Sequence, residues 1–147
     1  GKTAEELAAP VAELNGETLG DALIAPTRIY VKPVLNCLCN LPGDVHALAH
    51  ITGGGITENL NRALPETMDA LVNKDAWEVP AIIKMGIEAA GLTEEQALKT
   101  FNMGIGMVLI VDAARVDAVM DELAKSGEEP VVIGKIVEGA GVVRYAE

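Results

Sequence analysis

A strand-like segment, three consecutive glycines and a helical segment follow one another in this chain, and that order limits its fold more than any other feature. Apolar residues alternate with their neighbours along one stretch: Val45, Ala47, Ala49 and Ile51 against His46, Leu48 and His50. A period of two residues is typical of a β-strand with one buried face. Gly53–Gly55 come next, and apolar residues at helical spacing then continue to Leu64, before Pro65. The pattern predicts a strand over residues 45–51, a tight turn, and a helix over residues 56–64.

The rest of the sequence predicts short helices and strands in irregular order. Helices are expected over residues 21–24, 33–41, 80–90 and 93–100, and from Asp112, as a cap, to Gly127. Strands are expected over residues 68–72, 107–111, 131–137 and 142–145. Thr3 and Glu6 have the spacing of a capping box, but Pro10 interrupts the helix that they would start. Thr93 and Gln96 have the spacing of a second capping box, which starts the helix over residues 93–100. Because strands and helices do not alternate regularly, we predict the α+β class: one domain over residues 1–147, with a mixed β-sheet covered by helices.

The composition excludes several classes of function. The chain has 22 acidic and 11 basic residues, a net charge of −11, and only one Trp, two Tyr and one Phe. Binding to duplex nucleic acid needs a basic surface, and binding to single strands needs aromatic stacking platforms, so no nucleic-acid partner is expected. No apolar run approaches the roughly 18–20 residues of a membrane helix, and the N-terminal residues do not have the pattern of a signal peptide. We therefore expect no membrane partner and a cytoplasmic location.

No metal site is predicted within the chain. Cys37 and Cys39 are separated by one residue, which is poor spacing for a zinc site, and we interpret both as reduced, small apolar side chains. His46 and His50 have the spacing of two ligands on a helix, but they lie in a predicted strand, and Ala47 stands where a metalloprotease has a glutamate. No cluster of aspartates offers an oxygen cage for magnesium.

The three glycines lie in the least acidic part of the chain. Residues 25–62 have a net charge of +1 and contain both histidines, whereas residues 1–24 carry −4 and residues 63–147 carry −8. Glycines let the backbone approach a ligand closely, and the start of the following helix offers unpaired N–H groups. These features favour a site for a phosphate or a similar anion. The alternative is a tight turn that needs only a flexible backbone.

Three further groups of residues are candidates for the same site. His50 could bond a phosphate or donate a proton, or it could simply be satisfied by backbone groups at the strand end. Asn102, Gly104 and Gly106 suggest a backbone that curves around a ligand, or a bulge that enters a strand. Arg28 and Lys32 could reach a phosphate, or they could form ion pairs with the acidic flanks.

Three strings of sequence, taken together, resemble one family. Residues 23–32 (LIAPTRIYVK), 49–60 (AHITGGGITENL) and 100–107 (TFNMGIGM) are similar, in order and spacing, to the C-terminal domain of aminoimidazole ribonucleotide synthetase, also called phosphoribosylformylglycinamidine cyclo-ligase. The resemblance extends over nearly the whole chain. The triple glycine alone would indicate only the wider superfamily, which includes selenophosphate synthetase, thiamine-monophosphate kinase, a hydrogenase maturation factor and formylglycinamide ribonucleotide amidotransferase.

The resemblance implies a step of purine biosynthesis. ATP would activate the formyl oxygen of formylglycinamidine ribonucleotide, and ring closure would give aminoimidazole ribonucleotide, ADP and phosphate. ATP and Mg²⁺ would be bound mostly by an N-terminal domain, which is absent from this chain. The partners implied are the ribonucleotide, ATP and that domain, and the full-length enzyme would be a homodimer. The isolated chain is therefore predicted to be inactive.

The same resemblance suggests roles for individual residues. Thr52, Gly53, Gly54 and Gly55 would face a phosphate of the substrate or the nucleotide. Six further residues would line the same cleft: His50, which could transfer a proton, Arg28, Asn59, Asn102, Gly104 and Gly106. Two alternatives stay open, namely a sibling ATP-dependent enzyme of the superfamily and a non-catalytic domain for phosphate-ligand binding or assembly.

Overall fold

The strand predicted before the three glycines is present. The structure, a computed structural model, describes residues 1–146. Strand β1 (Val45–His50) pairs antiparallel with β3 (Met107–Val111), so that His50 lies opposite Met107. Ala49 is buried, whereas the side chains on either side of it in sequence, Leu48 and His50, are exposed. The alternation therefore reports a sheet with one buried face, as predicted.

The other three strands form a second, mixed sheet. Strand β2 (Met68–Val72) is central, with β4 (Gly134–Glu138) antiparallel on one side and β5 (Val143–Tyr145) parallel on the other. The α+β class is confirmed, and the strands are divided between two small sheets. The prediction of a strand from residue 131 was wrong for residues 131–133, which cross from the preceding helix to β4. Two of their side chains, Val131 and Val132, are 46% and 54% exposed.

Seven α-helices and three 3₁₀ turns are found in residues 1–146. The α-helices are α1 (Ala4–Ala8), α2 (Leu19–Ile24), α3 (Val31–Asn40), α4 (Gly55–Asn61), α5 (Ala81–Ala90), α6 (Glu94–Thr100) and α7 (Val116–Lys125). The 3₁₀ turns are η1 (Ala12–Leu14), η2 (Lys74–Ala76) and η3 (Ala113–Arg115). Both predicted capping boxes, which start α1 and α6, are present.

The two largest differences between predicted and observed helix ends, of three residues each, have local reasons. Helix α4 ends at Asn61 rather than Leu64, because the next residues form tighter turns that lead to Pro65, and a proline disfavours the α conformation in the residue before it. Asp112 caps η3 rather than α7: its Oδ1 accepts from the Ala114 N–H at 2.8 Å, and α7 begins only after this turn.

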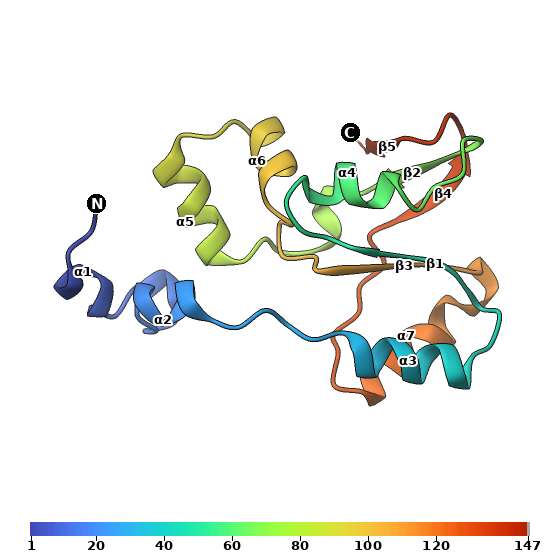
Figure 1. Ribbon diagram of the computed structural model, residues 1–147, viewed down its shortest axis with the longest axis horizontal. Helices are drawn as coiled ribbons and strands as arrows, with labels where there is room; N and C mark the ends of the chain where they lie inside the picture. The colour runs from blue at the N-terminus through green and yellow to red at the C-terminus, as the bar shows by residue number, and fades with distance from the viewer. Residues whose placement is uncertain (147) are drawn as a thin grey trace.

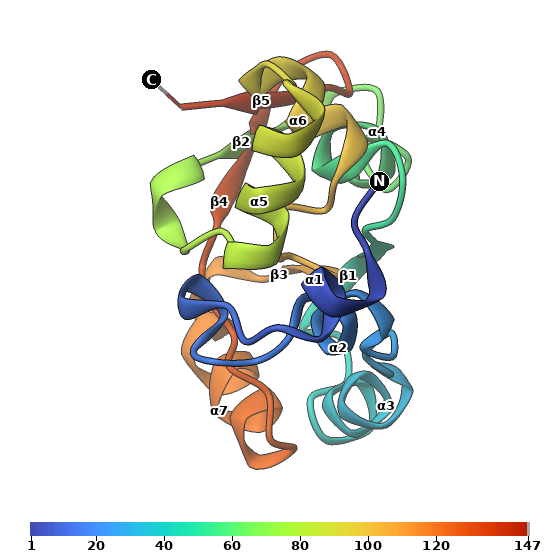
Figure 2. The same cartoon turned by 90° about the vertical axis from the view of Figure 1, so that its left-hand side faces the viewer.

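The elements are arranged around the β1–β3 pair. Helices α3 and α7 pack against each other on one side of it, and α4 and the three-stranded sheet lie on the other (Figures 1 and 2). The main core fills the second region: Ala49, Ile51, Ile56, Leu60, Ala70, Val72 and Val108. An extended, exposed linker, residues 25–29, joins α2 to the start of α3 (Figure 1). No helix in residues 1–146 is both long and apolar enough to cross a membrane.

The interface between α3 and α7 contains one of the two cysteines. Cys37 is fully buried there, and burial, together with the nearby Glu122 carboxylate, raises the pKa of its thiol. Asn40 donates to Glu122 Oε1 at 2.6 Å across the same interface. Cys39 is exposed on α3. Cys37 thus packs as a small apolar side chain, as predicted, whereas Cys39 faces solvent.

A buried carboxylate closes the loop between β4 and β5. Asp69 is 4% exposed, and its Oδ1 accepts from the N–H groups of Val142 at 3.0 Å and Ala140 at 2.7 Å. These two hydrogen bonds, and then the Arg144 guanidinium at 2.9 Å from Oδ2, hold the pKa of Asp69 below its ordinary value. The sequence pattern of the strands did not predict that this aspartate is buried or that it binds the loop.

Candidate functional site

The three strings of sequence that carry the family resemblance meet in the folded chain. Tyr30, in the first string, packs its ring against His50, in the second, with the ring centroids 6.1 Å apart. The Ile51 N–H donates to the carbonyl oxygen of Gly106, in the third string, at 2.9 Å. Gly55 packs on the C-terminal end of α6, where the third string begins. Segments separated by up to about 80 residues of sequence therefore form one region.

Each of the three consecutive glycines has a different surrounding. Gly53 is exposed, and a Cβ on it would meet nothing within 4 Å. Gly54 has φ +94°, in the left-handed region that favours glycine. Gly55 is buried with φ +61°, and a Cβ on it would overlap the carbonyl oxygen of Leu98. Gly55 is thus explained by packing and backbone conformation, whereas Gly53 leaves its backbone open to solvent.

The carbonyl groups of the loop are all engaged within the protein. The buried side chain of Asn59 donates through Nδ2 to the oxygens of Gly55 at 2.8 Å and Gly53 at 3.1 Å, and it lies 3.5 Å from the Thr52 oxygen. The Thr52 oxygen also accepts from the Gly55 N–H at 3.0 Å, and the Gly54 oxygen accepts from the Glu58 N–H at 3.2 Å. The side chain of Asn59 therefore stabilises the conformation of the loop and does not face a cleft.

The N–H groups at the start of the loop face no acceptor within the described part of the chain. The amides of Thr52, Gly53 and Gly54 donate to no protein atom in residues 1–146. Because the carbonyls are turned inward, the groups left to meet a ligand are donors, which suit an anion. One nearby charge opposes an anion: a Cβ on Gly54 would lie 2.6 Å from Glu58 Oε2.

The second glycine segment is a turn held by its own neighbours. Asn102 accepts through Oδ1 from the Gly104 N–H at 2.9 Å, and Gly104, with φ +96°, packs against Pro80. Trp77 donates through Nε1 to the Met103 carbonyl oxygen at 2.9 Å. The side chain of Asn102 is thus used to form the turn that leads into β3.

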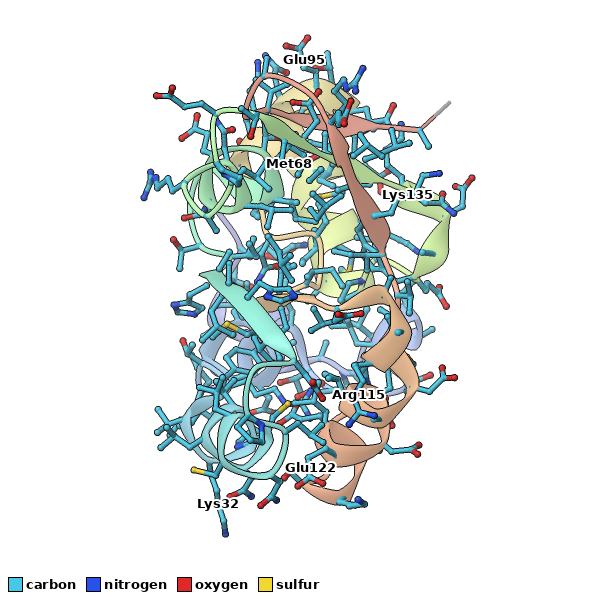
Figure 3. The ribbon with its side chains drawn as sticks, turned by 90° about the vertical axis from the view of Figure 1, so that its right-hand side faces the viewer. Lys32, Met68, Glu95, Arg115, Glu122 and Lys135 are labelled. Atoms are coloured by element: carbon cyan, nitrogen blue, oxygen red, sulfur yellow. The ribbon has the colours of Figure 1, made fainter. Side chains whose placement is uncertain are left out.

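The two basic residues of the first string do not reach the glycine loop. Arg28 forms an ion pair with Glu128, with Nε 3.3 Å from Oε2, so pairing with an acidic flank is the alternative that the structure contains. Lys32 lies on α3 and projects outward at that end of the molecule, whereas Glu95, on α6, lies at the opposite end (Figure 3). Helix α4, which follows the glycine loop, packs on α6 and not on α3.

A cavity elsewhere in the described part of the chain is lined by none of the glycine-loop residues. It has a volume of about 480 Å³ and lies between β3 and α7, with mostly apolar walls. Four of the predicted site residues or their neighbours line it: Arg28, Tyr30, Gly104 and Gly106. The predicted residues are therefore divided between this cavity and the loop of residues 52–55, and the Tyr30–His50 contact connects the two regions. The loop, with N–H groups that have no acceptor in residues 1–146, is better suited to an anion than the mostly apolar cavity.

Two features of this region were not recognised from the sequence. Tyr30 lies in the first string but had no predicted role of its own, although the scarcity of aromatic residues, four in the whole chain, is a signal that could have indicated one. The role of Asn59 in holding the loop was not recognised either, although its acceptors lie only four to seven residues away, because the sequence does not show which way the glycine carbonyls turn. No three His, Cys, Asp or Glu side chains in residues 1–146 are grouped so that they could hold a metal ion.

Comparisons with known proteins identify the family of this chain. Residues 2–147 match the family described as AIR synthase related protein, C-terminal domain, and the chain belongs to this family. Among curated relatives, the phosphoribosylformylglycinamidine cyclo-ligase of Alkaliphilus oremlandii (strain OhILAs) is 46% identical over 125 residues, covering 85% of this chain and 36% of the relative. The enzyme of the same name from Lachnospira eligens is 48% identical over 124 residues, covering 84% of this chain and 36% of the relative. The chain thus spans little more than a third of the length of these relatives.

Solved structures show the same fold in a more distant protein. The crystal structure of the E. coli hydrogenase maturation protein HypE matches 88% of this chain and 41% of its own length, with a TM-score of 0.62 and 24% identity. A second crystal structure of E. coli HypE gives a TM-score of 0.60 and 26% identity, covering 88% of this chain and 41% of its own length. These likenesses concern the arrangement of the elements and not the chemistry.

Proposed function

We propose that this chain is the C-terminal domain of a phosphoribosylformylglycinamidine cyclo-ligase that works in the cytoplasm. The observation that carries the proposal is the 46% identity, over 85% of the chain, to an enzyme of that name. In the reaction, the formyl oxygen of formylglycinamidine ribonucleotide attacks the γ-phosphorus of ATP, and ADP leaves. A nitrogen of the substrate then attacks the activated carbon, loses a proton, and closes the ring as phosphate leaves.

The contribution of this chain is to hold a phosphate group beside the reacting atoms. The N–H groups of Thr52, Gly53 and Gly54 would donate to phosphate oxygens, while Asn59 keeps the carbonyls turned away. His50 is exposed at the end of β1, directly before the loop, where it could transfer a proton. The described residues offer no carboxylate cluster that fits Mg²⁺, so the ion would be bound by another part of the enzyme, together with most of ATP. In this proposal, the contact between the two subunits of the homodimer also lies in that other part of the enzyme.

The first test is a chimeric enzyme in which this chain replaces the matching part of the Alkaliphilus oremlandii enzyme. We expect the chimera to form aminoimidazole ribonucleotide with kcat/KM within about tenfold of the parent, because nearly half of the aligned residues are identical. Formation of product is measured with and without ATP, and the parent lacking the matching part serves as the inactive control. A folded chimera that binds ATP but does not convert this ribonucleotide would favour a sibling enzyme or a non-catalytic domain instead.

A charge-removing variant tests whether the glycine loop binds phosphate. Glu58→Gln is expected to lower the dissociation constant for inorganic phosphate by about fivefold at low salt, because it removes a negative charge beside Gly54, an effect of about 1 kcal/mol. The measurement is a titration that follows the amide resonances of Thr52, Gly53 and Gly54. Glu13→Gln, in η1, makes the same change elsewhere and should leave the affinity unaltered. Equal phosphate affinities for the wild type and Glu58→Gln would contradict the assignment of the anion to this loop.

A further inference from the structure

Tyr30 fastens the exposed linker to the region of the glycine loop. Residues 25–29 are all exposed, whereas Tyr30 is half-buried at the start of α3. Within the linker itself, Arg28 forms an ion pair with Glu128, and the Arg28 side chain is 57% exposed. Because an exposed ion pair contributes little to ordering, the position of the linker depends mainly on the tyrosine ring.

The tyrosine ring is held between two residues that are distant in sequence. Its plane is inclined at 64° to the imidazole ring of His50, with the centroids 6.1 Å apart, which is a favourable edge-to-face arrangement. It also occupies the space above Gly106, where a Cβ would overlap the tyrosine hydroxyl and lie 2.8 Å from Cζ. The absence of a side chain at Gly106 therefore makes room for Tyr30.

Gly106 connects this contact to the start of the glycine loop. Its carbonyl oxygen accepts from the N–H of Ile51 at 2.9 Å, and Ile51 directly follows His50. Gly106 thus contacts both the backbone next to His50 and the tyrosine ring that packs on His50. An exposed histidine at a strand end otherwise has several side-chain rotamers, and a fixed ring against one side of it removes some of them.

We propose that Tyr30 is a positioning residue, which fixes the orientation of the His50 imidazole at the edge of the glycine loop. The proposal rests on the proposed function in so far as His50 takes part in the reaction. Tyr30 itself touches neither the loop amides nor a reacting atom. Its effect on activity passes through His50, and that dependence can be measured.

The spectroscopic test uses the only two histidines of the chain, His46 and His50. Tyr30→Leu should shift the imidazole resonances of His50, because the ring current is lost, and should leave those of His46 in place. Tyr30→Phe keeps the ring and should restore the His50 resonances. Gly106→Ala should also shift them, because the added methyl group displaces the tyrosine ring while both rings remain in the chain. Identical His50 resonances in the wild type and in Tyr30→Leu would overturn the proposal.

The kinetic test is a double-mutant cycle in the chimeric enzyme. Tyr30→Leu should lower kcat/KM by about tenfold when His50 is present, since small displacements of a catalytic group have effects of this order or larger. In the His50→Ala background, the same substitution should lower kcat/KM no further, because its effect passes through the missing imidazole. An additive loss in both backgrounds would overturn the proposal and make Tyr30 a purely structural residue.

The cycle also separates this inference from the proposed function. If His50→Ala is impaired and Tyr30→Leu is not, the positioning role of Tyr30 fails and the participation of His50 stands. If His50→Ala keeps full activity, the participation of His50 fails, and with it the effect of Tyr30 on the reaction. The His50 resonances then still decide whether the ring contact exists.

Discussion

Gly55→Ala is expected to destabilise the chain by about 3 kcal/mol, although it adds only one methyl group. Two effects combine. The residue has φ +61°, where an L-residue other than glycine has a cost of about 1 kcal/mol or more. The new Cβ would also overlap the carbonyl oxygen of Leu98, a backbone atom of α6 that can move only with its helix, and overpacking of this kind costs about 1–3 kcal/mol. For a domain of this size, a loss of about 3 kcal/mol corresponds to a decrease in Tm of roughly 10 °C.

The matched control for this prediction is the neighbouring glycine. Gly53→Ala places the same methyl group in open space, at a residue whose φ is not positive, and it should change the free energy of unfolding by less than about 0.5 kcal/mol. Urea denaturation of both variants gives the comparison directly. Similar free energies of unfolding for the two variants would show that the close approach of Gly55 to α6 is absent in solution. If Gly53→Ala weakens phosphate binding while its stability is unchanged, Gly53 is needed for ligand binding, whereas Gly55 is needed for folding.

This separation shows what the sequence could not reveal about the glycine loop. Three glycines in a row predicted an open backbone, and both alternatives considered for them, an anion site and a flexible turn, treated the three as equivalent. The structure makes them different because Gly55 contacts α6, about 40 residues further along the chain. A contact of that kind depends on tertiary packing, so no local pattern reports it.

Elements that depend on neighbouring residues were predicted well. The alternation of residues 45–51 gave β1, and the spacing of Thr93 and Gln96 gave the start of α6, because both patterns involve groups only two to three residues apart. Elements that depend on partners were predicted less well. Residues 131–133 have strand-forming side chains, but a strand also needs a neighbour to pair with, and their hydrogen-bonding partners do not form a ladder until Gly134.

The same distinction applies to the candidate site. The three strings meet in the folded chain, as their joint resemblance to one family implies, but the predicted site residues are divided between the glycine loop and the cavity. Their individual roles were not accessible. From the sequence, Arg28 could bind a phosphate or form an ion pair with an acidic residue. The fold decides this, because it brings Glu128, 100 residues away in sequence, to 3.3 Å from the Arg28 guanidinium.

Asn59→Asp is expected to have the second large effect, again of about 3 kcal/mol. The substitution hardly changes the shape of the side chain, but it replaces the Nδ2 donor by an oxygen that faces the carbonyl oxygens of Gly53 and Gly55. Two hydrogen bonds are lost, and a charged acceptor at a position only 8% exposed meets other acceptors, an arrangement that costs about 3 kcal/mol or more. The loop can relieve this conflict only by turning its carbonyls outward, which also removes the N–H groups from the position in which they could bind an anion.

Asn61→Asp provides the control, because it introduces the same charge on the same helix at an exposed position. We expect this control to change the free energy of unfolding by less than about 0.5 kcal/mol and to leave the Thr52, Gly53 and Gly54 amide resonances in place. In Asn59→Asp these resonances should shift. The hydrogen exchange of the Gly55 and Glu58 amides, which donate to loop carbonyl oxygens, should accelerate, because an open loop protects them less. Equal stability and equal amide spectra for the two variants would mean that Asn59 does not brace the loop. A loss of stability without a change in the loop amides would place its role in α4 alone.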